Sequence, residues 1–194
     1  MIRRICVFCG SSAGHDPAFI EAARTTGKVL AERDIGLVYG GGSVGLMGEV
    51  ADAVLAAGGE AIGVIPRALW DREIGHRGLT KIHIVETMHE RKAMMSSLSD
   101  AFLALPGGLG TYEEMFEVWT WAQLGMHEKP CGFLDVNGFY APLMSFLDSA
   151  VASGFIRGEH RAMAIIDRDI EKLIDRFSTY EPPRVVKWVR KGEE

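Results

Sequence analysis

The chain has 194 residues, of which 47% are hydrophobic, and this suits one compact domain rather than two. Its formal net charge of −5 disfavours nucleic acid as a partner, because phosphate backbones are bound by concentrated Lys and Arg. The sequence holds no run of about 18 apolar residues and opens directly into a strand pattern, so neither a membrane span nor a signal peptide is predicted and a cytoplasmic location is expected.

Short apolar runs of β-forming residues alternate with longer helical patterns along the chain. In chain order they predict a strand at 5–9, a helix at 17–33, a strand at 36–39, a helix at 46–57, strands at 61–65 and 82–85, a helix at 88–98, a strand at 101–105, a helix at 111–124, a strand at 131–134, a helix at 140–153, a strand at 164–166 and a helix at 170–177. The strands are continuous apolar runs, which is typical of strands covered by helices on both faces. The pattern predicts an α/β fold, a Rossmann-like three-layer sandwich with a mostly parallel sheet.

This alternation continues to about residue 180 without an internal repeat or a linker. We therefore predict a single Rossmann-like nucleotide-binding domain over residues 1–180 and a C-terminal tail over 181–194. The longest polar connection, residues 67–80, is expected to form a flap or an ordered loop.

Three cysteines are present, and two of them, Cys6 and Cys9, have the C-x-x-C spacing of redox and zinc sites. Residues three apart on a strand point to opposite faces, and no second Cys or His pair follows at ligand spacing. We interpret Cys6, Cys9 and Cys131 as ordinary buried thiols and predict no metal site.

Glycine or small hydroxyl residues follow three of the predicted strands, at residues 10–12, 40–45 and 107–111. Ligands of open α/β sheets bind beyond the carboxyl ends of the strands, and a glycine turn before a helix exposes backbone N–H groups to an anion. We expect these turns to form a phosphate-binding crevice that includes Gly10, Ser12, Gly41 and Gly42. The turn at 40–45 resembles a dinucleotide fingerprint only loosely, and a tight strand–helix turn is the alternative interpretation.

The segment from Pro106 to Glu114 is more specific. It combines a glycine turn with a helix start at which Thr111 would cap the helix or bind phosphate. Glu113 and Glu114 would then lie in the first turn, where acids favour the helix dipole, which is the simple explanation for both. Adjacent helical residues point about 100° apart, so only one of the two carboxylates can face a ligand. Glu114 shares the face of Thr111, whereas Glu113 shares a face with Glu117 and Thr120.

Another candidate follows the strand at 82–85, where Arg91 and Lys92 lie near the start of a helix. The guanidinium of Arg91 offers a bidentate fork for a phosphate or a carboxylate. A solvated basic pair is the alternative.

Together these motifs resemble the LOG ("Lonely Guy") family, the cytokinin riboside 5′-monophosphate phosphoribohydrolases. The resemblance rests on an upstream Arg91-Lys92 followed by P-G-G-x-G-T-x-x-E at residues 106–114, with supporting matches at residues 6–12, 39–42, 45–48 and 121–125. It covers roughly residues 2–180. Many similar sequences are labelled as possible lysine decarboxylases, but that reaction needs a pyridoxal-phosphate lysine with supporting groups that we do not find in the sequence.

The resemblance implies a homodimer that hydrolyses an N6-modified AMP or AMP to the free base and ribose 5-phosphate, with no metal and no cofactor. It implies that Arg91 and Glu114 form the catalytic pair. Because glycosidic cleavage passes through an oxocarbenium-like state, our hypothesis is that Glu114 orients water at the anomeric carbon. The substrate-binding residues would be Glu73, Arg91, Lys92, Gly107, Gly108, Leu109, Gly110, Thr111, Tyr112, Glu113, Glu114 and Thr120, with Gly10, Ser12, Gly41 and Gly42. Glu73 and Thr120 rest on weaker local matches, and Thr120 would reach a site across the dimer.

Two functions without turnover remain as alternatives. One is a nucleotide or molybdenum-cofactor carrier on the same fold, and the other is a nucleotide-sensing regulator. The pair of Arg91 and Glu114 favours the hydrolase, because a pure phosphate binder gains nothing from the carboxylate.

Overall fold

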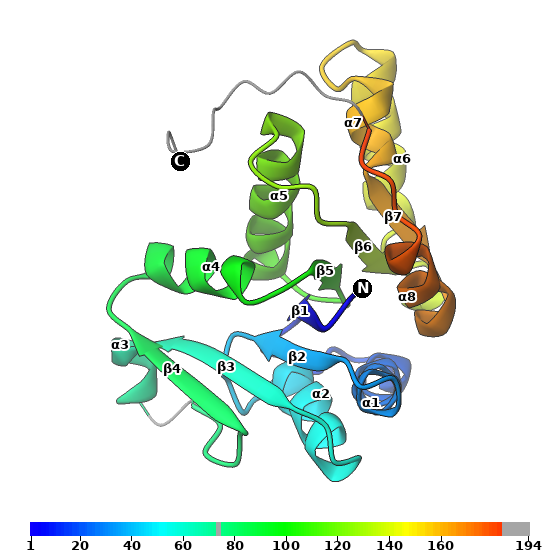
Figure 1. Cartoon of the computed structure of the whole chain (residues 1–194). Coiled ribbons are helices and arrows are strands. Elements are labelled where there is room, and N and C mark those ends of the chain that lie inside the picture. The colour runs from blue at the N-terminus through cyan, green and yellow to red at the C-terminus, as the bar shows by residue number, and fades with distance from the viewer. Residues whose placement is uncertain (73–74, 184–194) are drawn as a thin grey trace.

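The computed structural model describes residues 1–72 and 75–183, and in this part of the chain seven strands form one sheet (Figure 1). The strands are β1 (Arg4–Phe8), β2 (Gly36–Tyr39), β3 (Ala61–Pro66), β4 (Lys81–Val85), β5 (Ala101–Ala104), β6 (Cys131–Leu134) and β7 (Ala164–Asp167). They lie in the order β4-β3-β2-β1-β5-β6-β7, and every neighbouring pair is parallel. The predicted parallel α/β fold is therefore confirmed.

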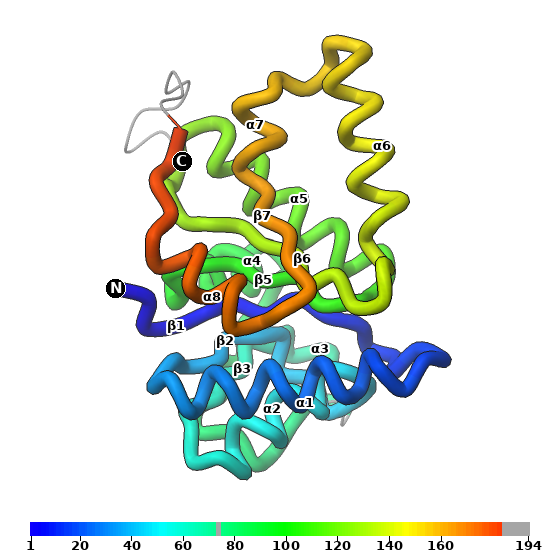
Figure 2. The backbone as a smooth tube through the Cα atoms, turned by 90° about the vertical axis from the view of Figure 1, so that its right-hand side faces the viewer, coloured from blue at the N-terminus to red at the C-terminus, as the bar shows by residue number. Residues whose placement is uncertain are grey.

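Helices cover both faces of this sheet, as the two views show (Figures 1 and 2). The helical elements are α1 (Pro17–Glu32), α2 (Gly45–Ala56), α3 (Arg67–Trp70), α4 (Met88–Ser97), α5 (Leu109–Leu124), η1 (Val136–Gly138), α6 (Ala141–Ala152), α7 (Gly158–Ala162) and α8 (Ile170–Ser178). The buried residues of α1, α2 and α8 belong to one core cluster, and those of α4, α5 and α6 to the other. This arrangement is the predicted three-layer sandwich. The short elements α3, η1 and α7 were not predicted, because three to five residues are too few to display a helical period.

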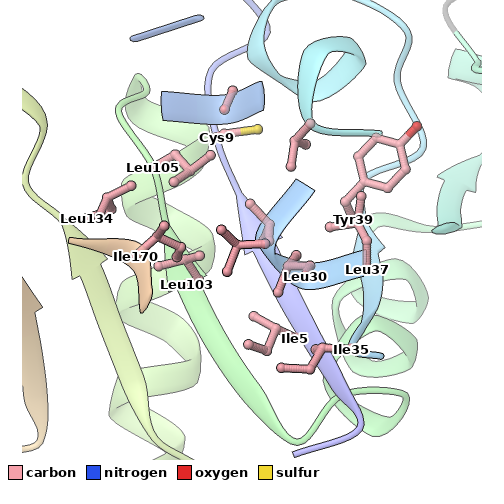
Figure 3. Packing of buried hydrophobic residues seen from close by; sticks show 14 of the residues in the cluster. Ile5, Cys9, Leu30, Ile35, Leu37, Tyr39, Leu103, Leu105, Leu134 and Ile170 are labelled. Carbon is pink, nitrogen blue, oxygen red and sulfur yellow. The ribbon is translucent and has the colours of Figure 1, made fainter. Parts of the chain in front are cut away.

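The alternation of side chains along β1 shows how one strand supplies both cores. Ile5 and Val7 pack in the cluster with α1 and α2, shown in Figure 3, whereas Cys6 and Phe8 pack in the cluster with α4 and α5. Cys9 lies in the first cluster, so Cys6 and Cys9 face opposite sides of the sheet, as predicted. All three cysteines are buried and free.

The order of the strands reverses between β1 and β5. From β1 the chain builds outward to β4, then crosses to the other side and builds outward from β5 to β7. The connections after β1 and β5 therefore lead to opposite halves of the sheet, and open α/β sheets bind ligands at such a point. The first and third of the glycine turns that we singled out, at residues 10–12 and 107–111, follow these two strands.

Two further findings bear on the sequence predictions. Among the described residues, no helix is long and apolar enough to cross a membrane. Near the predicted domain end, Tyr180 still packs against the core, and residues 184–194 of the predicted tail lie outside the described residues.

A partly buried histidine links α5 to the segment before β6. The Nδ1 atom of His127 accepts a hydrogen bond from the backbone N–H of Lys129 at 3.1 Å, so the ring donates through Nε2 to the carbonyl of Val118 at 2.9 Å. Its ring also lies 5.3 Å from that of Phe102. Burial lowers the pKa of His127 to about 4, and the nearby ammonium of Lys129 contributes to this, so the ring is neutral in the fold.

We predict that acid weakens the fold through His127. The unfolded chain takes up a proton near pH 6.5, whereas the folded chain resists until about pH 4, so the free energy of unfolding falls by up to about 3 kcal/mol as the pH drops across this interval. Urea unfolding measured from pH 7 to pH 4 tests this. His127→Gln should flatten the slope, and His15→Gln, which changes an exposed histidine, should leave it intact. Equal slopes in all three proteins would contradict the prediction.

Candidate active site

Helix α5 begins two residues earlier than its sequence suggested. It starts at Leu109, its N-cap is Gly108, and no side chain caps it, so of the two roles that we gave Thr111, cap or phosphate ligand, the cap is wrong. Glu113 and Glu114 consequently lie in the second turn, and the predicted explanation of these acids by the helix dipole is wrong. The uncapped first turn leaves backbone N–H groups without intrahelical partners, which is the arrangement that binds anions.

Glycines allow the surrounding loops to interlock closely at this helix start. The N–H of Gly10 donates to the carbonyl of Pro106 at 3.1 Å, and the N–H of Leu46 donates to the carbonyl of Gly10 at 3.0 Å. A Cβ atom on Gly107 would overlap the hydroxyl of Thr111, and one on Gly45, whose φ is +58°, would overlap the backbone of Ser11. The loops after β1, β2 and β5 thus form one rigid unit.

A pocket of about 220 Å³ opens above this unit. Its lining includes the backbone of residues 10–14 and 106–108, and four of the predicted binding residues are part of it: Gly10, Ser12, Gly107 and Gly108. Ligand pockets for drug-sized molecules are usually about 300–1,000 Å³. This pocket therefore fits part of a nucleotide, such as its phosphate end.

The second feature is a buried ion pair between α4 and α5. The Nη1 atom of Arg91 lies 3.2 Å from Oε1 of Glu114, and their side chains are only 11% and 12% exposed. The Nε atom of Arg91 donates to the carbonyl of Val64 at 3.1 Å. A Cβ atom on Gly40 would overlap the guanidinium, so this glycine makes room for it. The sequence predicted this proximity, and the guanidinium is not part of a solvated basic pair.

The pair lies further along α5 than the phosphate-sized pocket, whose lining reaches Gly108 at the start of this helix. Thr111 is buried against Gly107, and Glu114 follows three residues later on the same face of α5. One turn rises about 5 Å. Burial raises the pKa of Glu114, and the positive charge of Arg91 opposes this rise. A carboxylate with a raised pKa beside a cation in a crevice is a candidate catalytic group.

Lys92 engages the other acids of α5. Its ammonium lies 2.5 Å from Glu113 and 2.9 Å from Glu117, and the Lys92 side chain is only 10% exposed. Burial alone would lower the pKa of Lys92, but its hydrogen bonds to the two carboxylates raise it overall. Glu113 and Glu114 thus point to different partners, as the helical geometry predicted.

The remaining predicted residues of α5 occupy different surroundings. Leu109 is 86% exposed, and a Cβ on Gly110 would meet no atom within 4 Å. The ring of Tyr112 lies edge-to-face with Tyr140 at 6.4 Å. Thr120 is exposed and donates to the carbonyl of Phe116 at 2.7 Å, so within one chain it lies apart from the Glu114 carboxylate.

The loop after β2 is covered by the connection at residues 67–80, which we predicted to be a flap or an ordered loop. The carbonyl of Gly41 accepts a hydrogen bond from the N–H of His76 at 2.8 Å, and Gly42 forms a β-bridge with Gly75. The His76 ring also reaches Asp52 at 2.9 Å. From the sequence we did not single out His76, because no motif links it to Asp52, which lies 24 positions away in the chain. Glu73 lies outside the described residues.

A larger cavity of about 740 Å³ lies beside β6, β7 and α1 and contains none of the predicted residues. Four carboxylates and a single guanidinium, that of Arg168, line it: Glu21, Asp135, Asp169 and Glu171. This charge balance disfavours an anionic ligand there. Within the described residues, no group of three His, Cys, Asp or Glu side chains has the spacing of a metal site.

Known proteins are similar to this chain over most of its length. A family model described as "Possible lysine decarboxylase" matches residues 47–177. A probable cytokinin riboside 5′-monophosphate phosphoribohydrolase of Oryza sativa subsp. japonica is 52% identical over 180 residues, which cover 93% of this chain and 74% of the relative. A cytokinin riboside 5′-monophosphate phosphoribohydrolase of Arabidopsis thaliana is 51% identical over 180 residues, with coverage of 93% and 83%.

Solved structures share the fold at lower sequence identity. The molybdenum cofactor carrier protein of Chlamydomonas reinhardtii superposes with a TM-score of 0.69 at 19% identity, covering 92% of this chain and 98% of that one. The molybdenum cofactor binding protein of Rippkaea orientalis gives 0.68 at 20% identity, with coverage of 92% and 97%. At this identity the likeness extends to the fold alone.

We predict that Gly40→Ala displaces Arg91 and lowers the free energy of unfolding by about 1–3 kcal/mol, because the new methyl group overlaps a buried guanidinium. Urea denaturation measures the change. Gly158→Ala is the matched control, since a Cβ there meets no atom within 4 Å, and it should change stability by less than about 0.5 kcal/mol. The prediction fails if the two variants are equally stable.

Proposed function

Because the chain belongs to the LOG family of cytokinin riboside 5′-monophosphate phosphoribohydrolases, we propose that it hydrolyses the N-glycosidic bond of an N6-modified AMP or of AMP itself. The products are the free base and ribose 5-phosphate. The observation that carries the proposal is the buried pair of Arg91 and Glu114, in which Glu114 lies in the second turn of a helix whose start is uncapped. In the proposed complex the 5′-phosphate lies on the backbone of this helix start and the C1′ atom of the ribose lies near the acid.

In the proposed reaction a water oxygen bonds to C1′ while the bond between C1′ and the base nitrogen breaks. The electron pair of the broken bond leaves with the base, and the proton lost by water balances the proton that the base gains. The transition state resembles an oxocarbenium ion, which a nearby carboxylate stabilises. Glu114 orients the water and accepts its proton, and this proton then passes through solvent to the departing base, which regenerates the carboxylate. Arg91 holds the Glu114 carboxylate in place.

The phosphate anchor supplies binding energy away from the reacting bond. The N–H groups at the start of α5 would hold the 5′-phosphate, with Gly10 and Gly107 permitting its close approach. Remote binding of this kind positions the reacting centre and favours a nucleotide over its free nucleoside.

Two other activities fit the site less well. A carrier of the molybdenum-cofactor type would use the same fold, but phosphate binding gives no reason to bury a carboxylate beside the anion site. A decarboxylase needs a lysine amine that becomes neutral, whereas Lys92, which neighbours Arg91, is held as a cation by Glu113 and Glu117.

We also propose a homodimer in a cytoplasmic location. Thr120 falls at a family ligand position, yet it lies on the Lys92 side of α5 rather than on the Glu114 side. In a dimer, Thr120 of one subunit would reach the site of the other. Three buried, free thiols suit the reducing conditions of the cytoplasm.

The main test is the release of base from AMP and from N6-isopentenyl-AMP, followed by chromatography. We expect Glu114→Gln to reduce kcat by about 10²- to 10⁴-fold, because the carboxylate that activates water is lost. Glu113→Gln is the matched control, and it should retain most of the turnover because that acid faces Lys92.

The pH dependence gives an independent readout of the same assignment. Burial raises the pKa of Glu114, and activity requires its ionised form. The apparent pKa of the acidic limb of the kcat/KM profile should therefore lie above the ordinary pKa of a glutamate. A Glu114→Gln protein that folds and turns over normally would remove Glu114 from the mechanism. If the unmodified protein releases no base from any nucleotide, the hydrolase proposal is wrong and the carrier function is favoured.

The dimer proposal is tested by mixing two weakened variants, Glu114→Gln and Thr120→Ala, after reversible dissociation. If Thr120 serves the partner's site, each mixed dimer contains one intact site, and activity rises above that of either variant alone. Sedimentation gives the oligomeric state. A monomer in solution, or a mixture that gains nothing, would contradict the proposal.

A further inference from the structure

Two phenylalanines outside the motif line the phosphate-sized pocket. Phe19 comes from the first turn of α1, and Phe139 follows η1, so the two lie 120 positions apart in the sequence. Their rings meet edge-to-face with centroids 5.5 Å apart, and both residues line the pocket. They form a wall, here called the Phe19–Phe139 wall.

Hydrogen bonds fix this wall in place. One oxygen of Asp16 caps α1 by accepting from the N–H of Ala18 at 2.9 Å, and the other accepts from the side-chain amide of Asn137 at 2.9 Å. The start of α1 is thereby tied to η1, and the two rings are held at a set distance.

The Phe139 ring is also held from behind. It packs edge-to-face against the ring of Tyr140 at 5.0 Å, whose hydroxyl donates to the carbonyl of Leu105 at 2.6 Å. Tyr140 is fully buried. The wall is therefore part of the rigid end of β5 rather than a mobile surface.

The chemistry of the pocket differs from end to end. Its floor is backbone at the start of α5, which suits one phosphate group. None of the described residues that line the pocket is charged, and the charge nearest to the wall that we identify is the carboxylate of Asp16. A second phosphate would meet two apolar rings and an acid, with no cation to compensate its burial.

We propose that the Phe19–Phe139 wall makes the enzyme selective for nucleoside monophosphates over diphosphates and triphosphates. It closes the pocket directly behind the phosphate that is attached to the ribose, by shape and by the lack of positive charge. This inference rests on the proposed function, which places the 5′-phosphate at the start of α5.

The test compares AMP with ADP that has been freed of AMP, in the unmodified protein and in Phe139→Ala and Phe19→Ala. Base release gives kcat/KM for each nucleotide. We expect the preference for AMP to fall by at least about tenfold in either variant, because the pocket then extends beyond the first phosphate. Phe146→Ala removes an exposed phenylalanine of α6 and should keep the original preference.

Calorimetric binding of AMP and ADP keeps the inference testable if a variant unfolds. The unmodified protein should bind ADP at least about tenfold more weakly than AMP, and Phe19→Leu, which retains apolar bulk, should show an intermediate ratio. Equal binding of AMP and ADP by the unmodified protein would overturn the proposal. Variants that alter the preference for one base over another, but leave the preference for AMP over ADP unchanged, would also overturn it. If no base is released from any nucleotide, the hydrolase proposal fails, whereas the binding ratio still tests the wall.

Discussion

The architecture of the site depends on one buried interaction, the pair of Arg91 and Glu114. Taking two charges out of water is costly, and a buried pair often stabilises a fold no more than apolar side chains would. This protein nevertheless surrounds the pair with specific supports. Val64 provides a carbonyl for the guanidinium, Gly40 leaves it space, and a capping box of Thr87 and Glu90 fixes the start of the helix that carries it. Such supports are expected where a charge must be held ready for chemistry.

The same helix separates two acids into two roles. Glu113 and Glu117 neutralise Lys92 on one side of α5, while Glu114 faces the guanidinium on the other. The local charges of α4 and α5 are thus paired within the subunit. The proposed phosphate site needs no side-chain cation, because the interlocked loops after β1, β2 and β5 present backbone at a helix start instead. A net charge of −5 is therefore compatible with an anionic substrate.

Much of this site could be predicted from sequence because it is local. The fold follows from apolar runs, and the divergence of Glu113 and Glu114 follows from helical geometry. The start of α5 was misplaced because Leu109 and Gly110 are poor markers of a helix start, and the first turn is stabilised by loop packing that no local pattern records. Phe19, Phe139 and His76 were missed for a related reason. Each acts through a partner far away in the chain, and single residues without a motif carry no sign of that partner.

Fold and function can now be separated on physical grounds. The molybdenum-cofactor proteins share this architecture at about 20% identity, so the architecture by itself does not separate the hydrolase from a carrier. Anion binding alone does not explain a buried carboxylate nearby, because an acid repels the anion that the loops attract. A carboxylate placed one turn away, with its charge balanced by Arg91 and its pKa raised by burial, weakens that repulsion while remaining within reach of the ribose. Hydrolysis is the function that explains both the cost of the pair and its distance from the helix start.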